Sequence, residues 1–512
     1  MSAATAAFPT PRLSPLVGIH RWQRTAAVAV VVLAVATRLP HVLTPGVPAG
    51  DGGLFYLMAQ ALASSFPRLP ETVEYGALQI PFAYPPLGFY LSVIVDRLGP
   101  WGLLDVLRFL PLAFSVLTVV AAWLLLRELC PWPRWLVALL FFTLLPRSWN
   151  WEVVGGGITR SPGLFFLLLS MQQGVRAVRE EGGRFLPLWA ALAVLTHPEM
   201  GLMALAHPFL FAVALGRPEG RRRALLRAAA GSLLALALAS PWWAYALIAH
   251  GPDILLGAAS GSRYGPLATL LPLVVPFFYG EPGLPWLAAW GLAGVLLLAW
   301  RRQFFPLGWL VFLFLLDPRK AATIACLPLA LGGAWAAERL WHTLRPRCPS
   351  APALTLATLV LLGAVQSGMA HLSPLSPLNR LTKDDLAAMV WLRENAPAGA
   401  RVLVLSGLPW ASDPASEWLP ALTGLESVLT VQGSEWLGRA TFLERQQAFA
   451  ETSQCLRKGD CSGGELAQWH RADYVFVYSG CRCPRALEGL EPLLPGALYV
   501  PTVTDEAPAL PQ

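Results

Sequence analysis

Residues 85–97, "PPLGFYLSVIVDR", decide how this chain is threaded through a membrane. A transmembrane helix needs about 20 consecutive apolar residues, whereas runs of about 10 to 14 are more often re-entrant or interfacial. Here a short apolar run stands between two prolines and the charged pair Asp96 and Arg97. We therefore predict a helix that dips into the outer face without crossing, and this choice fixes the side on which every later loop lies.

The composition identifies the surroundings of the chain. Of its 512 residues, 55% are hydrophobic and only 13% are charged, and the mean hydropathy is +0.52, whereas soluble domains carry about 25% charged residues. The sequence therefore predicts a polytopic α-helical membrane protein. Its net charge of +7 does not indicate nucleic-acid binding, because basic residues in membrane proteins mostly mark the cytoplasmic loops.

Outward from residues 85–97, we predict eleven transmembrane helices and a C-terminus on the outer side. They fall near residues 25–43, 108–126, 135–149, 163–178, 185–200, 201–216, 228–248, 285–300, 304–317, 320–338 and 351–371. A short, proline-broken run at 266–278 is predicted to be a second re-entrant element. Segments expected inside carry about twice as many Lys and Arg as those expected outside, as the positive-inside rule requires.

Two domains are predicted: 1–371, a membrane domain with its first outer loop at about 44–107, and 372–512, an extracytoplasmic soluble α/β domain. In the latter, "TKDDLAAMVWLRENAPAGA" (382–400) is typical of a capped amphipathic helix ended by proline. "RVLVLSG" (401–407) and "ADYVFVYSG" (472–480) are typical of buried strands. We expect a multi-pass protein of the plasma membrane.

Four cysteines, Cys455, Cys461, Cys481 and Cys483, cluster in the soluble domain. In an oxidising compartment they predict two disulfides, with three possible connectivities. A zinc site is the alternative, although a single C-x-C pair without a second C-x-x-C favours it less.

The first carboxylate of the chain, Asp51, lies in "PAGDGGLFYLMAQALAS" (48–64), just past the first predicted span. Asp beside glycines is ordinary turn chemistry and a preferred helix cap. A carboxylate held at the membrane surface by a short turn could equally act as a general base or a metal ligand. The spacing alone leaves both interpretations open.

A resemblance to a known superfamily favours the catalytic interpretation. The order of a membrane anchor, an outer-loop Asp with a Tyr five residues later ("DGGLFY"), a "YPPLGFYL" helix and then "LRFLPLAFSVLTVVAAWLLLREL" resembles the GT-C superfamily of integral-membrane glycosyltransferases over roughly residues 25–375. That superfamily includes protein O-mannosyltransferases, lipid A aminoarabinose transferases and the oligosaccharyltransferase catalytic subunit. The resemblance implies a lipid-phosphate-linked sugar donor and inverting transfer on the outer face.

The resemblance also implies roles for residues of the first two outer loops. Asp51 matches the essential acidic residue and is implied as the general base. Glu152, in "NWEVVGGGITRSPG", matches a second acidic position and is implied as a second catalytic residue. It reaches the side of Asp51 only if residues 85–97 do not cross. Arg160 in the same loop suits a phosphate, and Tyr56 and Tyr84 are candidate substrate-binding residues.

Later loops add candidates for phosphate or metal. His197 and Glu199, in "LTHPEMGL", are either helix-end residues or, together with Glu152, ligands of a divalent cation such as Mg or Mn, which some members of the superfamily bind. Arg319 and Lys320, in "LLDPRKAATIACLPLAL", are either interfacial anchors or the cations that bind the donor phosphate, and of the two we favour Arg319 for the phosphate.

The sequence departs from the family pattern in two places. Ala83 and Tyr84 stand where the aminoarabinose transferases carry a Glu-Lys pair before the prolines, and no Asp-x-Asp pair follows in the second outer loop. Both departures put metal dependence in doubt. In the soluble domain, two Glu-Trp pairs could line a sugar site or belong to the core: Glu417, Trp418, Glu435 and Trp436.

The predicted function is inverting transfer of a sugar from a polyprenyl-phosphate donor to a hydroxyl of a lipid, glycan or protein acceptor, with Asp51 as base and membrane lipids around the chain. Two other classes stay open: a lipid or solute transporter or flippase, and a non-catalytic receptor or assembly factor. Transporters usually show paired halves with broken helices near the midplane, and the sequence shows no such internal symmetry.

Overall fold

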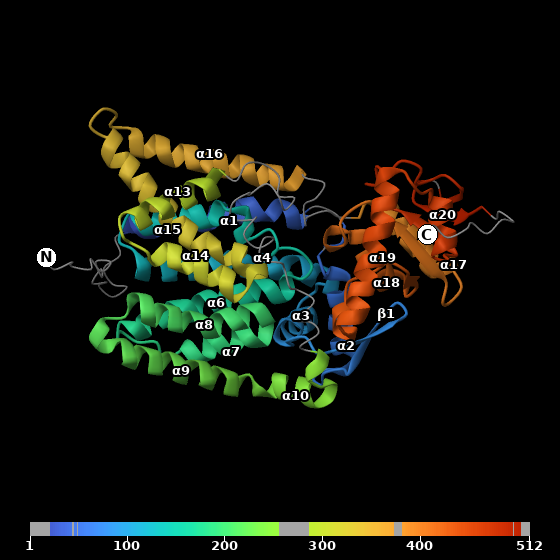
Figure 1. Ribbon diagram of the computed structural model, residues 1–512, viewed down its shortest axis with the longest axis horizontal. Helices are drawn as coiled ribbons and strands as arrows, with labels where there is room; N and C mark the ends of the chain where they lie inside the picture. Colours follow the sequence, from blue (N-terminus) through green and yellow to red (C-terminus); the bar gives the residue numbers. More distant parts are fainter. Residues whose placement is uncertain are drawn as a thin grey trace.

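A bundle of helices forms the larger part of the protein, and a smaller domain stands at one end of it (Figure 1). The computed structural model describes residues 21–43, 46–48, 50–254, 286–372, 381–494 and 496–502. The bundle consists of α1 (Arg21–Leu43), α4 (Leu103–Leu129), α5 (Arg134–Leu144), α6 (Gly157–Val178), α7 (Leu186–Thr196), α8 (Pro198–Leu215), α9 (Arg221–Leu238), α10 (Ser240–His250), α13 (Trp286–Trp300), α14 (Phe305–Leu316), α15 (Pro318–Leu344) and α16 (Ala351–Leu372). We call the end that carries the smaller domain the domain end.

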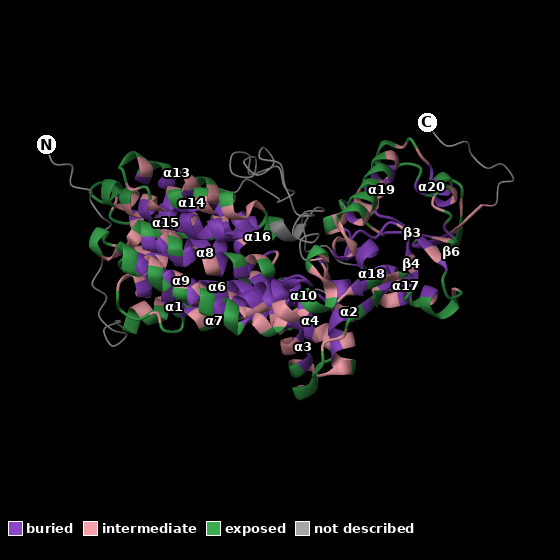
Figure 2. Ribbon diagram, turned by 60° about the horizontal axis from the view of Figure 1, so that its bottom comes forward, coloured by how far each residue is buried: buried purple, intermediate pink, exposed green. Residues whose placement is uncertain are grey.

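The helices have the apolar character that a membrane requires. Five of those described are long and apolar enough to cross on their own: α1, α4, α8, α15 and α16. The pair α9 and α10 passes the same test jointly, although it is bent by 58°. Apolar side chains fill the space between the helices, and buried residues run through the whole bundle in Figure 2. By the length and apolar composition of its helices, the chain is therefore a multi-pass membrane protein.

Proline explains where the predicted spans and the observed helices differ. The span predicted at 228–248 is wrong as a single straight helix, because α10 begins at Ser240 with Pro241 in its first turn. Proline removes a backbone donor and clashes with the preceding turn, which breaks a helix. In the same way α8 begins at Pro198, and not near residue 201 as predicted. The element predicted at 266–278 lies outside the described residues.

The first loop at the domain end contains short elements. These are α2 (Gly52–Ser65), the antiparallel hairpin of β1 (Thr72–Tyr75) and β2 (Leu78–Pro81), and α3 (Leu87–Leu98). Helix α3 is only 12 residues long and lies beside α2 at the domain end (Figure 1). Asp51 and Arg160, which precede and follow this region, contact each other. The short length of α3 agrees with the prediction that residues 85–97 do not cross the membrane.

The smaller domain is a mixed sheet flanked by helices. It contains α17 (Lys383–Asn395), β3 (Arg401–Leu405), α18 (Pro414–Thr423), β4 (Glu426–Ser427), α19 (Arg439–Lys458), α20 (Gly463–Trp469), β5 (Tyr474–Val477), β6 (Leu490–Leu494) and β7 (Leu498–Pro501), with short 3-10 turns at η4 (Trp410–Ser412) and η5 (Ser434–Leu437). The strand order is β4-β3-β5-β7-β6, with β3 parallel to β4 and β5. The predicted capped helix is present, because Thr382 and Asp385 form a capping box on α17.

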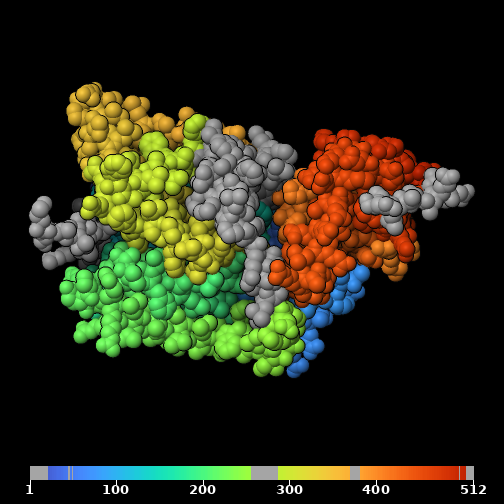
Figure 3. Space-filling model, in the orientation of Figure 1, coloured from blue at the N-terminus to red at the C-terminus, as the bar shows by residue number. Residues whose placement is uncertain are grey.

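The domain packs on the first loop, and the two share apolar cores. Trp418 from α18 contacts Tyr56 from α2, with ring centroids 5.8 Å apart. Trp436 from η5 packs among the side chains of α2, β2 and α3. In Figure 3 the orange and red domain lies against the blue first loop. The domain is therefore placed directly over the loop that carries Asp51.

The cysteines follow the disulfide prediction only in part. Cys455 and Cys461 are bridged, whereas Cys481 and Cys483 carry free thiols beside Gly407. The expected second disulfide is therefore not formed. Because two of the four sulfur atoms are consumed by the bridge, a four-cysteine zinc site is not formed either.

Candidate active site

Asp51 lies in a turn of residues 50–53 that leads into α2. Gly50 and Asp51 both have positive φ angles, 76° and 71°, a region that glycine enters freely and aspartate tolerates. The Asp51 side chain makes no capping hydrogen bond with α2. It forms an ion pair with Arg160, in the first turn of α6. The interpretation of this side chain as a helix cap is therefore wrong.

The exposure of this ion pair differs between its two partners. The Arg160 side chain is 7% exposed and that of Asp51 is 32% exposed. A carboxylate that faces solvent and is oriented from behind by a buried cation can receive a proton from an arriving hydroxyl group. The pair thus has the geometry that a general base at a surface site needs.

The triple-glycine loop before α6 holds the turn from the bundle side. Gly156 donates its backbone N–H to the carbonyl of Gly50 at 2.7 Å. A Cβ on Gly155 would come within 2.2 Å of the Gly52 Cα, so only glycine permits this approach. The two loops predicted to lie on one side of the membrane are in direct contact.

Glu152, in the same loop, is buried without a hydrogen-bonding partner. It is 1% exposed, and neither carboxylate oxygen has a hydrogen bond among the described residues. Burial raises the pKa of Glu152, while the positive charges of Lys320 and Arg160 act in the opposite direction. An unsatisfied buried carboxylate between two cations is costly for stability, and such groups are frequent at functional sites.

A second charged group forms where two helix pairs turn at the domain end. Glu199, at the start of α8, lies 3.4 Å from Nε of Arg319 and 3.8 Å from Nζ of Lys320, both at the start of α15. His197 Nδ1 is 4.0 Å from the same carboxylate. The structure therefore brings these four predicted residues together. Lys320 is 10% exposed at its side chain and Arg319 is 43% exposed.

Of the two tyrosine candidates, only Tyr84 lies at this site. Its ring packs against those of His197 and Trp436, with centroids 6.1 and 5.7 Å away. Burial raises its pKa, so the phenol stays protonated and can donate. Tyr56 instead faces Trp418 at the domain contact, and its hydroxyl accepts a hydrogen bond from Gln60 at 2.7 Å.

The smaller domain supplies a contact that the sequence analysis did not assign to this turn. The Glu417 carboxylate accepts hydrogen bonds from the backbone N–H groups of Gly50 and Gly53, both at 2.9 Å. Glu417 and Asp51 are hundreds of positions apart, and no local pattern links them. The only signal in the sequence was the Glu417-Trp418 pair itself, a carboxylate beside a large aromatic side chain.

The candidate metal ligands do not form a metal site. Among the residues that the structure describes, no three His, Cys, Asp or Glu side chains lie close enough to share an ion. Glu199 already faces two cations, whose charges disfavour a further one. Glu152, His197 and Glu199 therefore do not fit a divalent cation.

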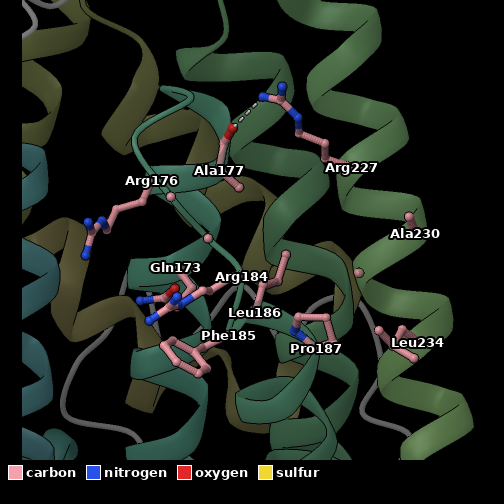
Figure 4. A pocket seen from close by; sticks show the side chains of 13 residues that line it. Gln173, Arg176, Ala177, Arg184, Phe185, Leu186, Pro187, Arg227, Ala230 and Leu234 are labelled. Atoms are coloured by element: carbon pink, nitrogen blue, oxygen red, sulfur yellow. Dashed lines mark hydrogen bonds between the residues drawn. The ribbon is translucent and has the colours of Figure 1, made fainter.

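A cavity of about 690 Å³ lies at the opposite end of the bundle, between α6, α7 and α9 (Figure 4). Its lining includes Arg176, Arg184 and Arg227 but no carboxylate. Arg176 and Arg227 each donate a hydrogen bond to a backbone carbonyl, of Glu181 and Ala177. These arginines do not converge on the cavity, and we place the chemistry at the domain end.

No protein-family model and no curated protein matches the sequence. Solved structures do match, and they define the class of the fold. The archaeal oligosaccharyltransferase AglB from Archaeoglobus fulgidus, in complex with an inhibitory peptide and a dolichol-phosphate, has a TM-score of 0.57 and 14% identity over 89% of this chain and 69% of its own. The arabinofuranosyltransferase AftD from Mycobacteria has a TM-score of 0.50 and 17% identity over 95% of this chain and 40% of its own.

A third similar protein matches along almost its whole length. ArnT from Cupriavidus metallidurans, in the apo state, has a TM-score of 0.57 and 16% identity over 94% of this chain and 98% of its own. ArnT has also been solved bound to undecaprenyl phosphate, with a TM-score of 0.52. These similar proteins are GT-C glycosyltransferases, and the predicted resemblance is confirmed for the fold.

Proposed function

We propose that this protein is a membrane glycosyltransferase that moves a sugar from a polyprenyl-phosphate donor to an acceptor hydroxyl on the outer face of the membrane. One observation carries the proposal: a part-exposed carboxylate, Asp51, is oriented by the buried Arg160 beside a group of cations, at the domain end of a GT-C fold. Two similar structures support a lipid-phosphate ligand, because they were solved with dolichol-phosphate and with undecaprenyl phosphate.

The proposed reaction forms one bond and breaks one. The acceptor oxygen attacks the anomeric carbon from the side opposite the phosphate, so the configuration inverts. The bond between that carbon and the phosphate oxygen breaks, and its electron pair leaves with the polyprenyl phosphate. Asp51 takes the acceptor proton. Because phosphate is a workable leaving group, the protein mainly positions the acceptor and stabilises the developing charge.

The cations divide into two roles in this proposal. The charges of Lys320 and Arg160 both act on the buried Glu152, and these two cations would bind the departing phosphate. Arg319, being more exposed, would guide the donor headgroup from the membrane surface. Tyr84, which stays protonated, would donate a hydrogen bond to sugar or phosphate. Glu152 would keep the two buried cations in place before the donor binds.

The test is sugar transfer in membranes supplied with labelled polyprenyl-phosphate sugars. Asp51→Asn keeps the size of the side chain but removes the base, and we expect transfer to fall by roughly 100-fold or more. Asp105→Asn is the matched control, because Asp105 lies in the first turn of α4 at the same end and is 48% exposed. It should keep near wild-type transfer. Full activity in Asp51→Asn would show that Asp51 is not the base.

A further inference from the structure

Glu417 joins the smaller domain to the turn that carries Asp51. It lies in α18 and is 1% exposed. One carboxylate oxygen accepts from the Gly50 N–H and the other from the Gly53 N–H, both at 2.9 Å. A buried backbone N–H group is costly to leave without a hydrogen-bonding partner. A residue of the C-terminal domain therefore accepts hydrogen bonds from the turn on both sides of Asp51.

The turn needs this external partner. Asp51 lies in the left-handed region, which a residue other than glycine occupies at a cost. The first N–H groups of a helix have no partner within the helix. Asp51 occupies the N-cap position but does not cap α2. Glu417 performs that task from another domain.

Glu417 is itself held firmly in place. Tyr75, in β1, donates its hydroxyl to the Glu417 carbonyl at 2.5 Å. The adjacent Trp418 donates its indole N–H to the carbonyl of Pro48 at 2.8 Å. A Cβ on Gly53 would come within 2.4 Å of the Glu417 carbonyl oxygen. The turn and α18 are thus fitted to each other and cannot shift independently.

We propose that Glu417 is a positioning residue of the transferase site: it fixes the turn so that the Asp51 carboxylate faces Arg160 and the acceptor. The inference rests on the proposed role of Asp51 as base. Glu417 holds the turn on one side and the triple-glycine loop holds it on the other. The C-terminal domain is consequently part of the active site and not an appendage of it.

The test combines amide hydrogen exchange with kinetics in the full-length protein. Glu417→Gln replaces one acceptor oxygen with an NH₂ group, which opposes a backbone N–H. We expect exchange at residues 50–53 to rise at least about tenfold, the size expected for leaving a buried backbone N–H without its hydrogen bond. We expect kcat to fall by a similar factor, with the KM for the donor unchanged within about twofold. Glu491→Gln, on the exposed edge strand β6, is the matched control.

A milder variant guards against simple misfolding. Trp418→Phe keeps the Glu417 carboxylate and removes only the bond to Pro48, so exchange and kcat should change in the same directions but less. Unchanged exchange in Glu417→Gln would overturn the structural contact, and faster exchange with normal kcat would overturn the positioning role. A wild-type protein that transfers no sugar would instead refute the proposed function, and the positioning role with it.

Discussion

Lys320 and Arg319 are neighbours in sequence, yet their surroundings differ. Lys320 is 10% exposed at its side chain and influences the buried Glu152, whereas Arg319 is 43% exposed. A charge in a water-poor position acts more strongly on a bound phosphate than one in solvent. The sequence favoured Arg319 as the phosphate ligand, whereas burial now favours Lys320.

We expect Lys320→Met to lower kcat/KM for the lipid-phosphate donor by about 100-fold and Arg319→Met by about tenfold or less. Loss of a buried cation removes charge stabilisation where the leaving group forms, while solvent and salt already screen the exposed one. Initial rates at several donor concentrations measure both effects. A larger loss in Arg319→Met than in Lys320→Met would contradict this order.

Glu417 also predicts how stability depends on pH. Burial raises its pKa to about 8, the Asp51 charge adds to the effect, and the backbone N–H groups oppose it. The folded protein therefore holds this proton more tightly than the unfolded chain does, where glutamate titrates near pH 4.3. The stabilisation is complete below that pH and is lost as pH rises to about 8.

Thermal unfolding in detergent from pH 5 to pH 9 measures this dependence. The wild-type Tm should fall more steeply over this range than the Tm of Glu417→Gln, which cannot titrate at this position. Asp51→Asn should end the decline at a lower pH and make it smaller, because the neighbouring negative charge that helps raise the Glu417 pKa is removed. Equal slopes in the wild type and Glu417→Gln would contradict the raised pKa.

The helix α2 depends on two glycines for its approach to α18. Gly53→Ala would normally favour a helix, but here the added methyl group meets the Glu417 carbonyl oxygen at 2.4 Å. We expect a loss of about 1–3 kcal/mol in the free energy of unfolding, as in other overpacked sites.

Gly102→Ala is the matched control for this glycine. Gly102 lies at the N-cap of α4, and a Cβ there meets nothing within 4 Å. Thermal or denaturant unfolding of both variants gives the comparison. If Gly53→Ala were as stable as Gly102→Ala, the close fit of α2 on α18 would be wrong.

The hydrophobic pattern predicted where helices occur better than where they end or bend. Periodicity and length located the membrane helices and the non-crossing α3, because burial of apolar surface is a local property of the sequence. The 58° bend between α9 and α10 was missed, although Pro241 was a signal for it. The span boundary near residue 200 was misplaced by the same kind of proline.

The candidate site was predictable where the sequence places charges in loops of an apolar chain. Asp51, Arg160, Glu199 and Lys320 were found on that basis, and the structure brings them to one end of the bundle. The ion pair of Asp51 with Arg160 and the hydrogen bonds of Glu417 to the Asp51 turn were not predictable. Both are contacts between distant segments, which depend on how helices and domains pack and not on local spacing.

The proposed arrangement places the domain end outside the cell and the arginine-lined cavity inside. Cysteines introduced at two exposed residues test this: Trp101→Cys between α3 and α4, and Arg217→Cys between α8 and α9. In intact cells, a membrane-impermeant maleimide should label position 101, while position 217 should react only after permeabilisation. Peptide masses separate these sites from the native cysteines. The reverse pattern would place Asp51 inside and exclude outer-face transfer.

The contact between Gly50 and Glu417 spans 367 positions of the chain. During synthesis, the Asp51 loop is made long before the segment that completes its support, and contacts of high sequence separation form late in folding. In a ribosome-bound intermediate with all its membrane helices inserted, the Asp51 turn would still lack its hydrogen bonds to Glu417. On the proposed role of Asp51, the chain would therefore be inactive until the smaller domain has folded.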